Sequence, residues 1–301
     1  MTTRHWLDKH ARALTGKTVA VTGSTGGLGR ELCHDLAQLG ASLVLLDRNP
    51  DKAAALRQEL TAAYPSLSLR QIRLNLEDMD SVRAAVAALE EAPPDVLIHN
   101  AGAYAIPRHT CSTGYDNVFQ IDCASPYCMT RMLLPALRRQ HTRVVVVGSI
   151  AHRYSPTDPA DVDFSSRAPS HLVYGNAKRR LMFGFYELFR KEREVSLAVV
   201  HPGIAFTNIT AHYPPWLFAI IKYPMKVLFM SPRRAALSIL AGVFEPCDDG
   251  EWIGPWLFDV WGLPRKSRLR SCPPAERRQI GKQAEEMWRR ISSQAKNAMT
   301  E

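Results

Sequence analysis

Apolar residues along the first two thirds of the chain alternate between short continuous runs and longer runs with helical spacing. The short runs, which predict strands, lie at residues 17–22, 42–46, 69–74, 95–98, 143–147 and 195–200. The segments between them predict helices, at residues 30–39, 51–63, 79–91, 114–140 and 172–192. Strands that are apolar without alternation are typical of a parallel sheet covered by helices on both faces. The pattern therefore predicts a doubly wound α/β fold.

The pattern changes after residue 202. Residues 213–230 are rich in aromatic residues, prolines and aliphatic residues, and Lys222 and Lys226 are their only charges. Three prolines break any long helix in this stretch. We interpret residues 203–231 as an insertion that forms a lid over an apolar substrate. Packing in the core or against another subunit, and contact with a membrane surface, are the alternatives.

Residues 262–301 form a basic C-terminal extension, with ten Lys or Arg against four Asp or Glu. Charge runs of this kind are usually the solvated face of a helix. No nucleic-acid motif accompanies them, so no nucleic-acid partner is expected. The chain has no linker-like Gly/Ser run and no internal repeat. Residues 1–301 are therefore predicted to form a single domain.

Composition places the chain among globular proteins. Its 301 residues are 46% hydrophobic and 22% charged, which excludes a disordered chain and a small disulfide-stapled domain. The net charge of +9 favours anionic partners in general. The six cysteines have no metal-ligand spacing, so we expect free thiols in a reducing compartment and no metal. A polar N-terminus and the lack of a long apolar run predict neither a signal peptide nor a membrane span, so a cytoplasmic location is expected.

A glycine-rich segment, T-G-S-T-G-G-L-G at Thr22–Gly29, stands between the first predicted strand and the first predicted helix. Gly23 permits a sharp turn, Gly27 lets the backbone approach a pyrophosphate, and Gly29 lets the helix pack closely on the strand. The phosphates would lie at the helix N-terminus, where unpaired N–H groups and the helix dipole favour negative charge. Between a strand and a helix, this motif predicts a dinucleotide site.

Two charged residues follow the second predicted strand. Asp47 ends that strand, where an acidic side chain can accept hydrogen bonds from both hydroxyls of a ribose. It would repel a 2′-phosphate, although the adjacent Arg48 could hold one instead. The alternative is that both belong to a polar turn before the next helix. The cofactor is therefore predicted to be NAD or NADP, with NAD favoured.

Three residues further along predict the chemistry. Tyr174 and Lys178 are four apart in a predicted helix, so both project from one face. Ser149 follows a predicted strand, at the carboxyl edge where such sheets bind ligands. A tyrosine is a poor base at neutral pH, and a neighbouring ammonium favours its ionised form. Tyr174 could then exchange a proton with an alcohol or carbonyl while Ser149 holds the substrate oxygen.

The motifs together resemble the short-chain dehydrogenase/reductase family of the classical type, over nearly the whole chain. The family's order is followed by Thr22–Gly29, H-N-A-G at His99–Gly102, Ser149, Y-G-N-A-K at Tyr174–Lys178 and H-P-G at His201–Gly203. A looser similarity, to the retinol-dehydrogenase-like branch, rests on further features. These are the long Ser149–Tyr174 spacing, the apolar residues 213–230, I-G-P at Ile253–Pro255 and W-G-L-P at Trp261–Pro264.

This resemblance implies a Rossmann fold and a role for each matching residue. It implies that Tyr174 is the catalytic acid/base, that Lys178 tunes it and binds the nicotinamide ribose, and that Ser149 completes the catalytic set. The implied cofactor site consists of Gly23, Ser24, Thr25, Gly27, Leu28, Gly29, Asp47, Arg48, Asn75, Leu76, Asn100, Ala101, Gly102, Tyr174, Lys178, Pro202, Gly203 and Thr207.

The chain departs from the family pattern at three positions. Asn75 stands where the family usually has Asp, and His99 where it usually has Asn, and both replacements still form hydrogen bonds. Asp122 stands where the family usually has an Asn whose backbone holds a water of the proton relay, and we count it among the catalytic candidates. If only its backbone matters, the change is mild. If the side chain matters, its charge would raise the pKa of Tyr174 and slow catalysis.

The resemblance implies an NAD(P)-dependent oxidoreductase that interconverts a hydroxyl and a carbonyl on an apolar substrate, such as a retinoid, a steroid or a long-chain carbonyl. The alternative is a redox sensor or scaffold that binds a dinucleotide without chemistry. The partners expected are the small substrate, a membrane surface in a peripheral contact, and further copies of the chain. The family resemblance suggests that copies would associate through the helices near 114–140 and 172–192.

Overall fold

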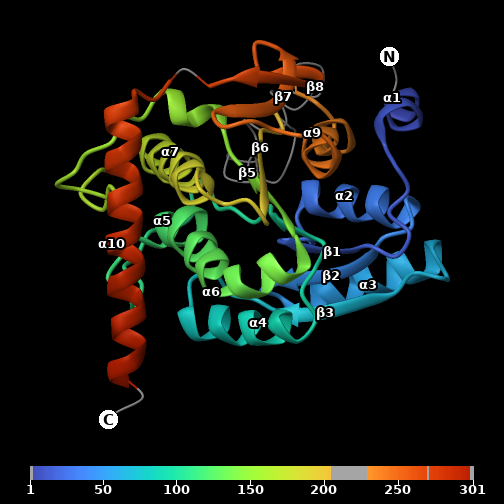
Figure 1. Cartoon of the computed structure of the whole chain (residues 1–301), viewed down its shortest axis with the longest axis horizontal. Coiled ribbons are helices and arrows are strands. Elements are labelled where there is room, and N and C mark those ends of the chain that lie inside the picture. Colours follow the sequence, from blue (N-terminus) through green and yellow to red (C-terminus); the bar gives the residue numbers. More distant parts are fainter. Residues whose placement is uncertain (1–2, 205–228, 270, 299–301) are drawn as a thin grey trace, which may run out of the picture.

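The computed structural model of the chain describes residues 3–204, 229–269 and 271–298 (Figure 1). Within these ranges eight strands form one sheet, in the order β3-β2-β1-β4-β5-β6-β7-β8. Their bounds are β1 Thr18–Thr22, β2 Ser42–Asp47, β3 Leu69–Arg73, β4 Val96–His99, β5 Arg143–Val147, β6 Ser196–Val200, β7 Glu251–Leu257 and β8 Trp261–Arg268. The first seven pair in parallel, which confirms the predicted doubly wound sheet. The last strand, β8, is antiparallel to β7.

Helices cover both faces of this sheet, as predicted (Figure 1). One face packs against α1 (Thr3–His10), α2 (Gly27–Gln38), α3 (Pro50–Ala63) and α9 (Pro232–Phe244). The other packs against α4 (Met79–Glu91), α6 (Ser125–Gln140) and α7 (Ser170–Phe189), and α10 (Pro274–Ala298) lies outside α6 and α7. Strands buried on both faces need apolar side chains throughout, and all four residues of β4 and the last four of β1 and β5 are buried.

The single helix predicted at residues 114–140 is wrong, because three elements replace it. Asp116 caps the short α5 (Asn117–Phe119), a π-helical turn follows as η1 (Gln120–Ala124), and α6 begins at Ser125. Pro126 explains the break, since it has no N–H with which to bond the carbonyl of Asp122 four residues earlier. The interruption lies in the segment that carries the catalytic candidate Asp122.

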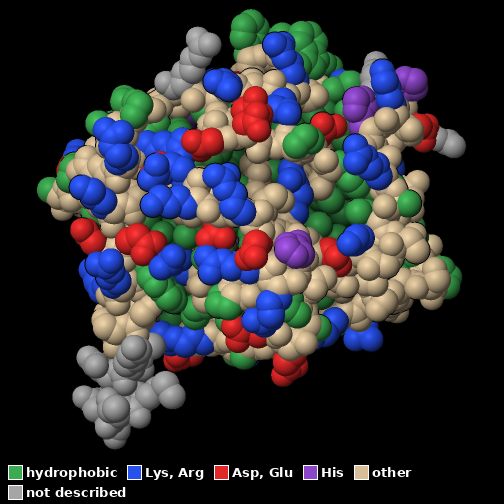
Figure 2. Space-filling view, in the orientation of Figure 1, with side chains coloured by type: hydrophobic (Ala, Val, Ile, Leu, Met, Phe, Trp, Pro, Cys, Tyr) green, Lys and Arg blue, Asp and Glu red, His purple; other side chains and the backbone are tan. Residues whose placement is uncertain are grey.

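The C-terminal part of the chain forms regular secondary structure. Residues 262–301, predicted as a basic extension, supply most of β8 and the long helix α10. Helix α10 lies along the α7 side of the molecule, where Glu276 pairs with Arg179 at 2.6 Å and Tyr127 donates to Glu285 at 2.8 Å. Figure 2 shows Lys and Arg interspersed with Asp and Glu on this side of the surface.

Helix α10 covers part of the helical face through which association of copies was expected. Its partner α7 is buried from Gly175 to Tyr186, all the way round its circumference. The expected oligomer stays a prediction, but α7 offers little free surface for it.

Most of the predicted lid, residues 203–231, falls in 205–228, outside the described residues, and so does Thr207. The ends of the segment are described: Ile204 donates its amide N–H to Val260, and Met230 donates to Ile204. Among the described residues, every helix is too short or too polar to cross a membrane.

Candidate active site

The glycine-rich loop connects β1 to α2 and is packed too tightly for side chains at two positions. Gly23 has a φ of 65°, and a Cβ there would lie 2.9 Å from the Cα of Ala101. A Cβ on Gly29 would lie 2.3 Å from the carbonyl oxygen of Gly23. Helix α2 begins at Gly27, so the first-turn N–H groups, which have no carbonyl partner within the helix, face the end of the loop. The loop and the start of α2 have the backbone geometry that an anion cradle needs, and the dinucleotide site itself stays a prediction.

Asn100 ties this loop to the neighbouring strand. It follows β4, and its side-chain amide donates to the carbonyls of Thr22 and Gly23 at 3.0 and 3.1 Å. The Thr22 hydroxyl in turn accepts from the backbone N–H groups of Asn100 and Ala101 at 3.0 Å each. Thr22 was not singled out from the sequence, although it opens the motif that was.

Asp47 lies at the end of β2 and is buried, with its carboxylate turned toward the glycine-rich loop. One oxygen accepts from the backbone N–H and the hydroxyl of Thr25, at 3.0 and 2.9 Å, and the other accepts from the Ser24 hydroxyl. A carboxylate offers about four acceptor positions, so three bonds leave room for one more. Asp47 therefore fixes the loop and has one acceptor position left, enough for one of the two ribose hydroxyls that the sequence predicts will donate to it.

Tyr174 lies on the first turns of α7, beside the end of β5. Ser149 caps the short helix η2 (Ile150–Arg153) and makes a hydrogen bond with Tyr174, and the two side chains meet as predicted. The Tyr104 ring packs edge-on against the Tyr174 ring, with centroids 5.3 Å apart. Tyr104 was not predicted, because it lies just beyond the H-N-A-G motif at His99–Gly102, in a stretch with no motif of its own.

Lys178 is buried one turn below Tyr174, with its ammonium nitrogen 5.7 Å from the centre of the tyrosine ring. The nitrogen donates to the carbonyl of Val147 at 3.1 Å and lies 2.9 Å from Oδ1 of Asp122. The second oxygen of Asp122 accepts from the N–H of Ala103 at 3.0 Å. Gly102 leaves room for the pair, since a Cβ there would lie 2.6 Å from Oδ1. The side chain of Asp122, and not only its backbone, therefore contacts Lys178.

Burial and charge act against each other on these groups. Burial raises the pKa of Tyr174 above that of a free tyrosine, Lys178 lowers it, and Asp122 raises it again. Burial also raises the pKa of Asp122, against the effect of Lys178. For Lys178, burial lowers the pKa, but Asp122 and Tyr174 together bring it above the usual value. The ammonium therefore stays charged, and its influence on Tyr174 is partly cancelled by Asp122.

The remaining predicted residues lie at or just after the ends of strands β3, β4 and β6. Asn75 uses its side chain to accept from the N–H of Glu77 at 3.3 Å, and Leu76 is buried. His99 is buried and contacts the Thr130 hydroxyl at 2.7 Å, and burial lowers its pKa to about 3. Pro202 and Gly203 follow β6 at the same edge of the sheet, and Gly203 has a φ of 79°.

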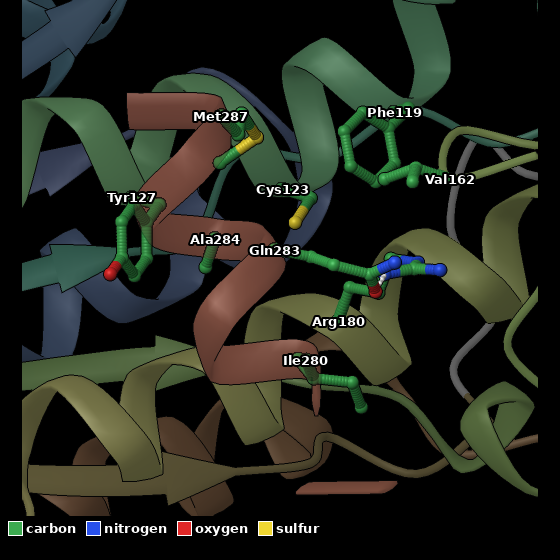
Figure 3. Close-up of a pocket in the computed structure, with 9 residues that line it drawn as sticks. All are labelled: Phe119, Cys123, Tyr127, Val162, Arg180, Ile280, Gln283, Ala284 and Met287. Atoms are coloured by element: carbon green, nitrogen blue, oxygen red, sulfur yellow. Dashed lines mark hydrogen bonds between the residues drawn. The ribbon is translucent and has the colours of Figure 1, made fainter. Parts of the chain in front are cut away.

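A small pocket lies behind η1, between α10 and the helices α6 and α7 (Figure 3). Its walls are mostly apolar, and Arg180 there donates to Gln283 at 2.6 Å. Cys123, next to Asp122 in the chain, faces it, and burial raises the pKa of the thiol to about 12. None of the predicted catalytic residues lines this pocket.

An anion cradle at a helix N-terminus and a buried lysine beside a tyrosine at the same sheet edge are the features of a dinucleotide-dependent oxidoreductase. Comparison with known proteins makes the class specific. The sequence model of short chain dehydrogenases matches residues 17–159. An uncharacterised oxidoreductase of Schizosaccharomyces pombe is 28% identical over 82% of this chain and 77% of its own length. Retinol dehydrogenase 12 of Mus musculus is 27% identical over 88% of this chain and 84% of its own length.

The fold agrees with these matches. The solved structure of an uncharacterised protein from Mycobacterium paratuberculosis superposes with a TM-score of 0.75, at 22% identity, over 92% of this chain and 95% of that one. The chain belongs to the short-chain dehydrogenase/reductase family, and its similarity to retinol dehydrogenases agrees with the branch that the sequence suggested. It is an oxidoreductase of the class that acts on CH–OH groups with NAD(P).

Proposed function

We propose that this protein interconverts a hydroxyl and a carbonyl on an apolar substrate, with Tyr174 as the acid/base. The observation that carries the proposal is the buried contact of Lys178 with Asp122 and Val147 beside Tyr174. An ammonium held at this place favours the phenolate, which a redox-inactive binding protein does not need.

The described residues fit a dinucleotide. The loop at Gly23 has the backbone geometry of an anion cradle, Asp47 has one acceptor position left, and Lys178 donates one hydrogen bond, to Val147, beside its ion pair with Asp122, so it has an N–H donor left. Loop and α2 would hold the pyrophosphate, and Lys178 would use its remaining donor on the nicotinamide ribose. When bound, the nicotinamide accepts or supplies the hydride.

The protein's own residues handle the proton. In alcohol oxidation, Tyr174 accepts the hydroxyl proton as phenolate, while Ser149 donates a hydrogen bond to the substrate oxygen. In carbonyl reduction, the neutral phenol of Tyr174 returns that proton. Lys178 lowers the energy of the phenolate in both directions, because its positive charge lies beside the ring.

NAD is the favoured cofactor in this proposal. Asp47 and Glu77 are carboxylates beside Arg48, and negative charge near the ribose disfavours a 2′-phosphate. The apolar substrate class is supported by the sequence of residues 213–230 and by the name of the mouse relative, a retinol dehydrogenase. We also propose a cytoplasmic location, which the six unpaired cysteines support.

The alternative is a redox sensor that binds a dinucleotide without turnover. Asp122 is the observation that favours it, because its charge opposes ionisation of Tyr174. The same carboxylate also pairs with Lys178 and holds its ammonium beside Tyr174, which offsets part of the unfavourable effect on ionisation of Tyr174.

Replacement of the tyrosine hydroxyl tests the proposal. Tyr174→Phe should lower turnover of retinol, a steroid alcohol and decanal by at least about 1,000-fold, because it removes the proton carrier. Affinity for NADH should change by less than about twofold. Tyr64→Phe, at the end of α3, is the matched control and should keep full activity. Turnover that survives in Tyr174→Phe would sink the assignment. NADH binding by the unmodified protein with no turnover of any probe would favour the sensor.

A further inference from the structure

A second carboxylate, Glu77, lies beside Arg48 and takes part in none of the proton-transfer steps above. It follows β3 in the loop that leads to α4, and its two oxygens have different partners. Nη1 of Arg48 donates to Oε1 at 3.0 Å, and Nε2 of His109 lies 3.2 Å from Oε2. No sequence pattern singled out Glu77, because its partner Arg48 is 29 positions away in the chain.

The two members of this ion pair differ in freedom. The Glu77 side chain is 18% exposed and that of Arg48 is 69% exposed. The backbone of Glu77 is held from both sides, since its carbonyl accepts from the Gln120 side chain at 2.7 Å and its N–H donates to Asn75 at 3.3 Å. The carboxylate is therefore the fixed partner, and the guanidinium is the one that can move.

The position of this pair bears on the difference between NAD and NADP, which is a phosphate on the adenine ribose. A phosphate dianion is best held by a free guanidinium, which can donate two hydrogen bonds in parallel. Here the guanidinium is engaged, and its carboxylate partner would remain close to the phosphate even after Arg48 had turned away. Asp47, at the end of the adjacent strand, adds a second negative charge.

We propose that Glu77 is a specificity-determining residue, which holds Arg48 in an ion pair and sets negative charge beside the adenine ribose, so that the protein prefers NAD(H) to NADP(H). The inference rests on the proposed function, because it needs a dinucleotide in the glycine-rich cradle. It assigns part of the preference for NAD(H) to Glu77, which follows β3, and not only to Asp47 at the end of β2. An exposed ion pair is weak, so Glu77 biases the choice and does not forbid NADP(H).

The test is fluorescence titration of the full chain with NADH and with NADPH. Glu77→Gln keeps the size of the side chain and removes its charge. The dissociation constant for NADPH should fall by about 5- to 10-fold, while that for NADH changes by less than about twofold. The gain should shrink at 0.5 M NaCl, as expected of charges near the surface.

Two further variants make the result specific. Glu59→Gln is the matched control, because Glu59 also pairs with one arginine and one histidine, Arg30 and His34, and the change in net charge is the same. It should leave the ratio of the two dissociation constants unchanged. In an Arg48→Ala background, Glu77→Gln should keep only the part of its effect that comes from direct repulsion of the phosphate, so the gain in NADPH affinity should be smaller than in the Glu77→Gln single variant.

Each remaining outcome counts against a stated claim. Equal changes for the two dinucleotides in Glu77→Gln, or the same gain in Glu59→Gln, would overturn the inference while the proposed function stands. Failure of the unmodified chain to bind either dinucleotide would overturn both. The proposed function is tested separately by turnover in Tyr174→Phe.

Discussion

Two buried aspartates, Asp47 beside the glycine-rich loop and Asp122 beside Lys178, have opposite electrostatic surroundings. Asp47 accepts only from neutral donors, the Ser24 hydroxyl and the N–H and hydroxyl of Thr25. Asp122 faces the ammonium of Lys178 at 2.9 Å. Both are almost fully buried.

The difference shows that burial alone does not give a carboxylate its role. Neutral donors satisfy Asp47 and leave its charge in place, so the ribose end of the cleft stays negative. Lys178 cancels the charge of Asp122, so the chemical end is close to neutral until Tyr174 ionises. We expect one aspartate to select a ligand and the other to set the ease of a proton transfer.

The largest expected effect comes from removing the ammonium. Lys178→Met should lower the free energy of unfolding by about 3–5 kcal/mol, because Asp122 is left buried without a partner. The double variant with Asp122→Asn should recover most of that loss. Without Lys178, the pKa of Asp122 lies above its unfolded value, so folding takes up a proton and the loss should grow between pH 5 and pH 8. Denaturant unfolding at both pH values measures this, and a double variant no more stable than Lys178→Met would count against the pairing.

A smaller effect is expected at the tyrosine. Asp122→Asn removes a charge that raises the pKa of Tyr174, so the rising limb of the pH profile for alcohol oxidation should move toward acid by about one pH unit. The measurement is kcat/KM against pH. Asp35→Asn, a buried aspartate on α2 across the sheet, is the matched control and should leave the profile in place. An unmoved profile in Asp122→Asn would make the side chain structural only.

The smallest effect is expected at the ribose end. Asp47→Asn keeps an acceptor for Thr25 but loses the charge, so NADH should bind more weakly by roughly 3- to 5-fold, or about 1 kcal/mol. NADPH should lose less, because repulsion of its phosphate is relieved. Parallel fluorescence titrations measure both. Equal losses for the two cofactors would mean that Asp47 acts only by fixing the loop.

The sequence predicted the parts of this site that depend on local spacing. Tyr174 and Lys178 share a helix face because they are four residues apart, and Ser149 follows a strand whose apolar run is unbroken. Asp122, which contacts Lys178, lies in the π-helical turn before Pro126, and the spacing of apolar residues in the sequence does not predict such a turn. That is why the role of the Asp122 side chain was left open.

The final hairpin was missed for a related reason. Pro255 on β7 pairs with Pro264 on β8, and prolines normally count against strands because they lack an N–H donor. The I-G-P and W-G-L-P motifs were used only as signs of a family branch, and no strand was predicted there. The pairing is possible because β8 is the last strand of the described sheet and β7 pairs with β6 only at Trp252 and Ile253, before Pro255. Glu77 was missed because its proposed role depends on its contact with Arg48, which is distant from it in the sequence.

The two outer strands of the sheet bear on how the protein behaves at high concentration. An outer strand exposes unpaired backbone groups, which can recruit a strand from another molecule and begin aggregation. Strand β3 carries Arg70 and Arg73, and β8 carries Arg265, Lys266 and Arg268. The positive charges on these two edge strands repel the same strands of a second molecule. They therefore disfavour edge-to-edge pairing of two sheets.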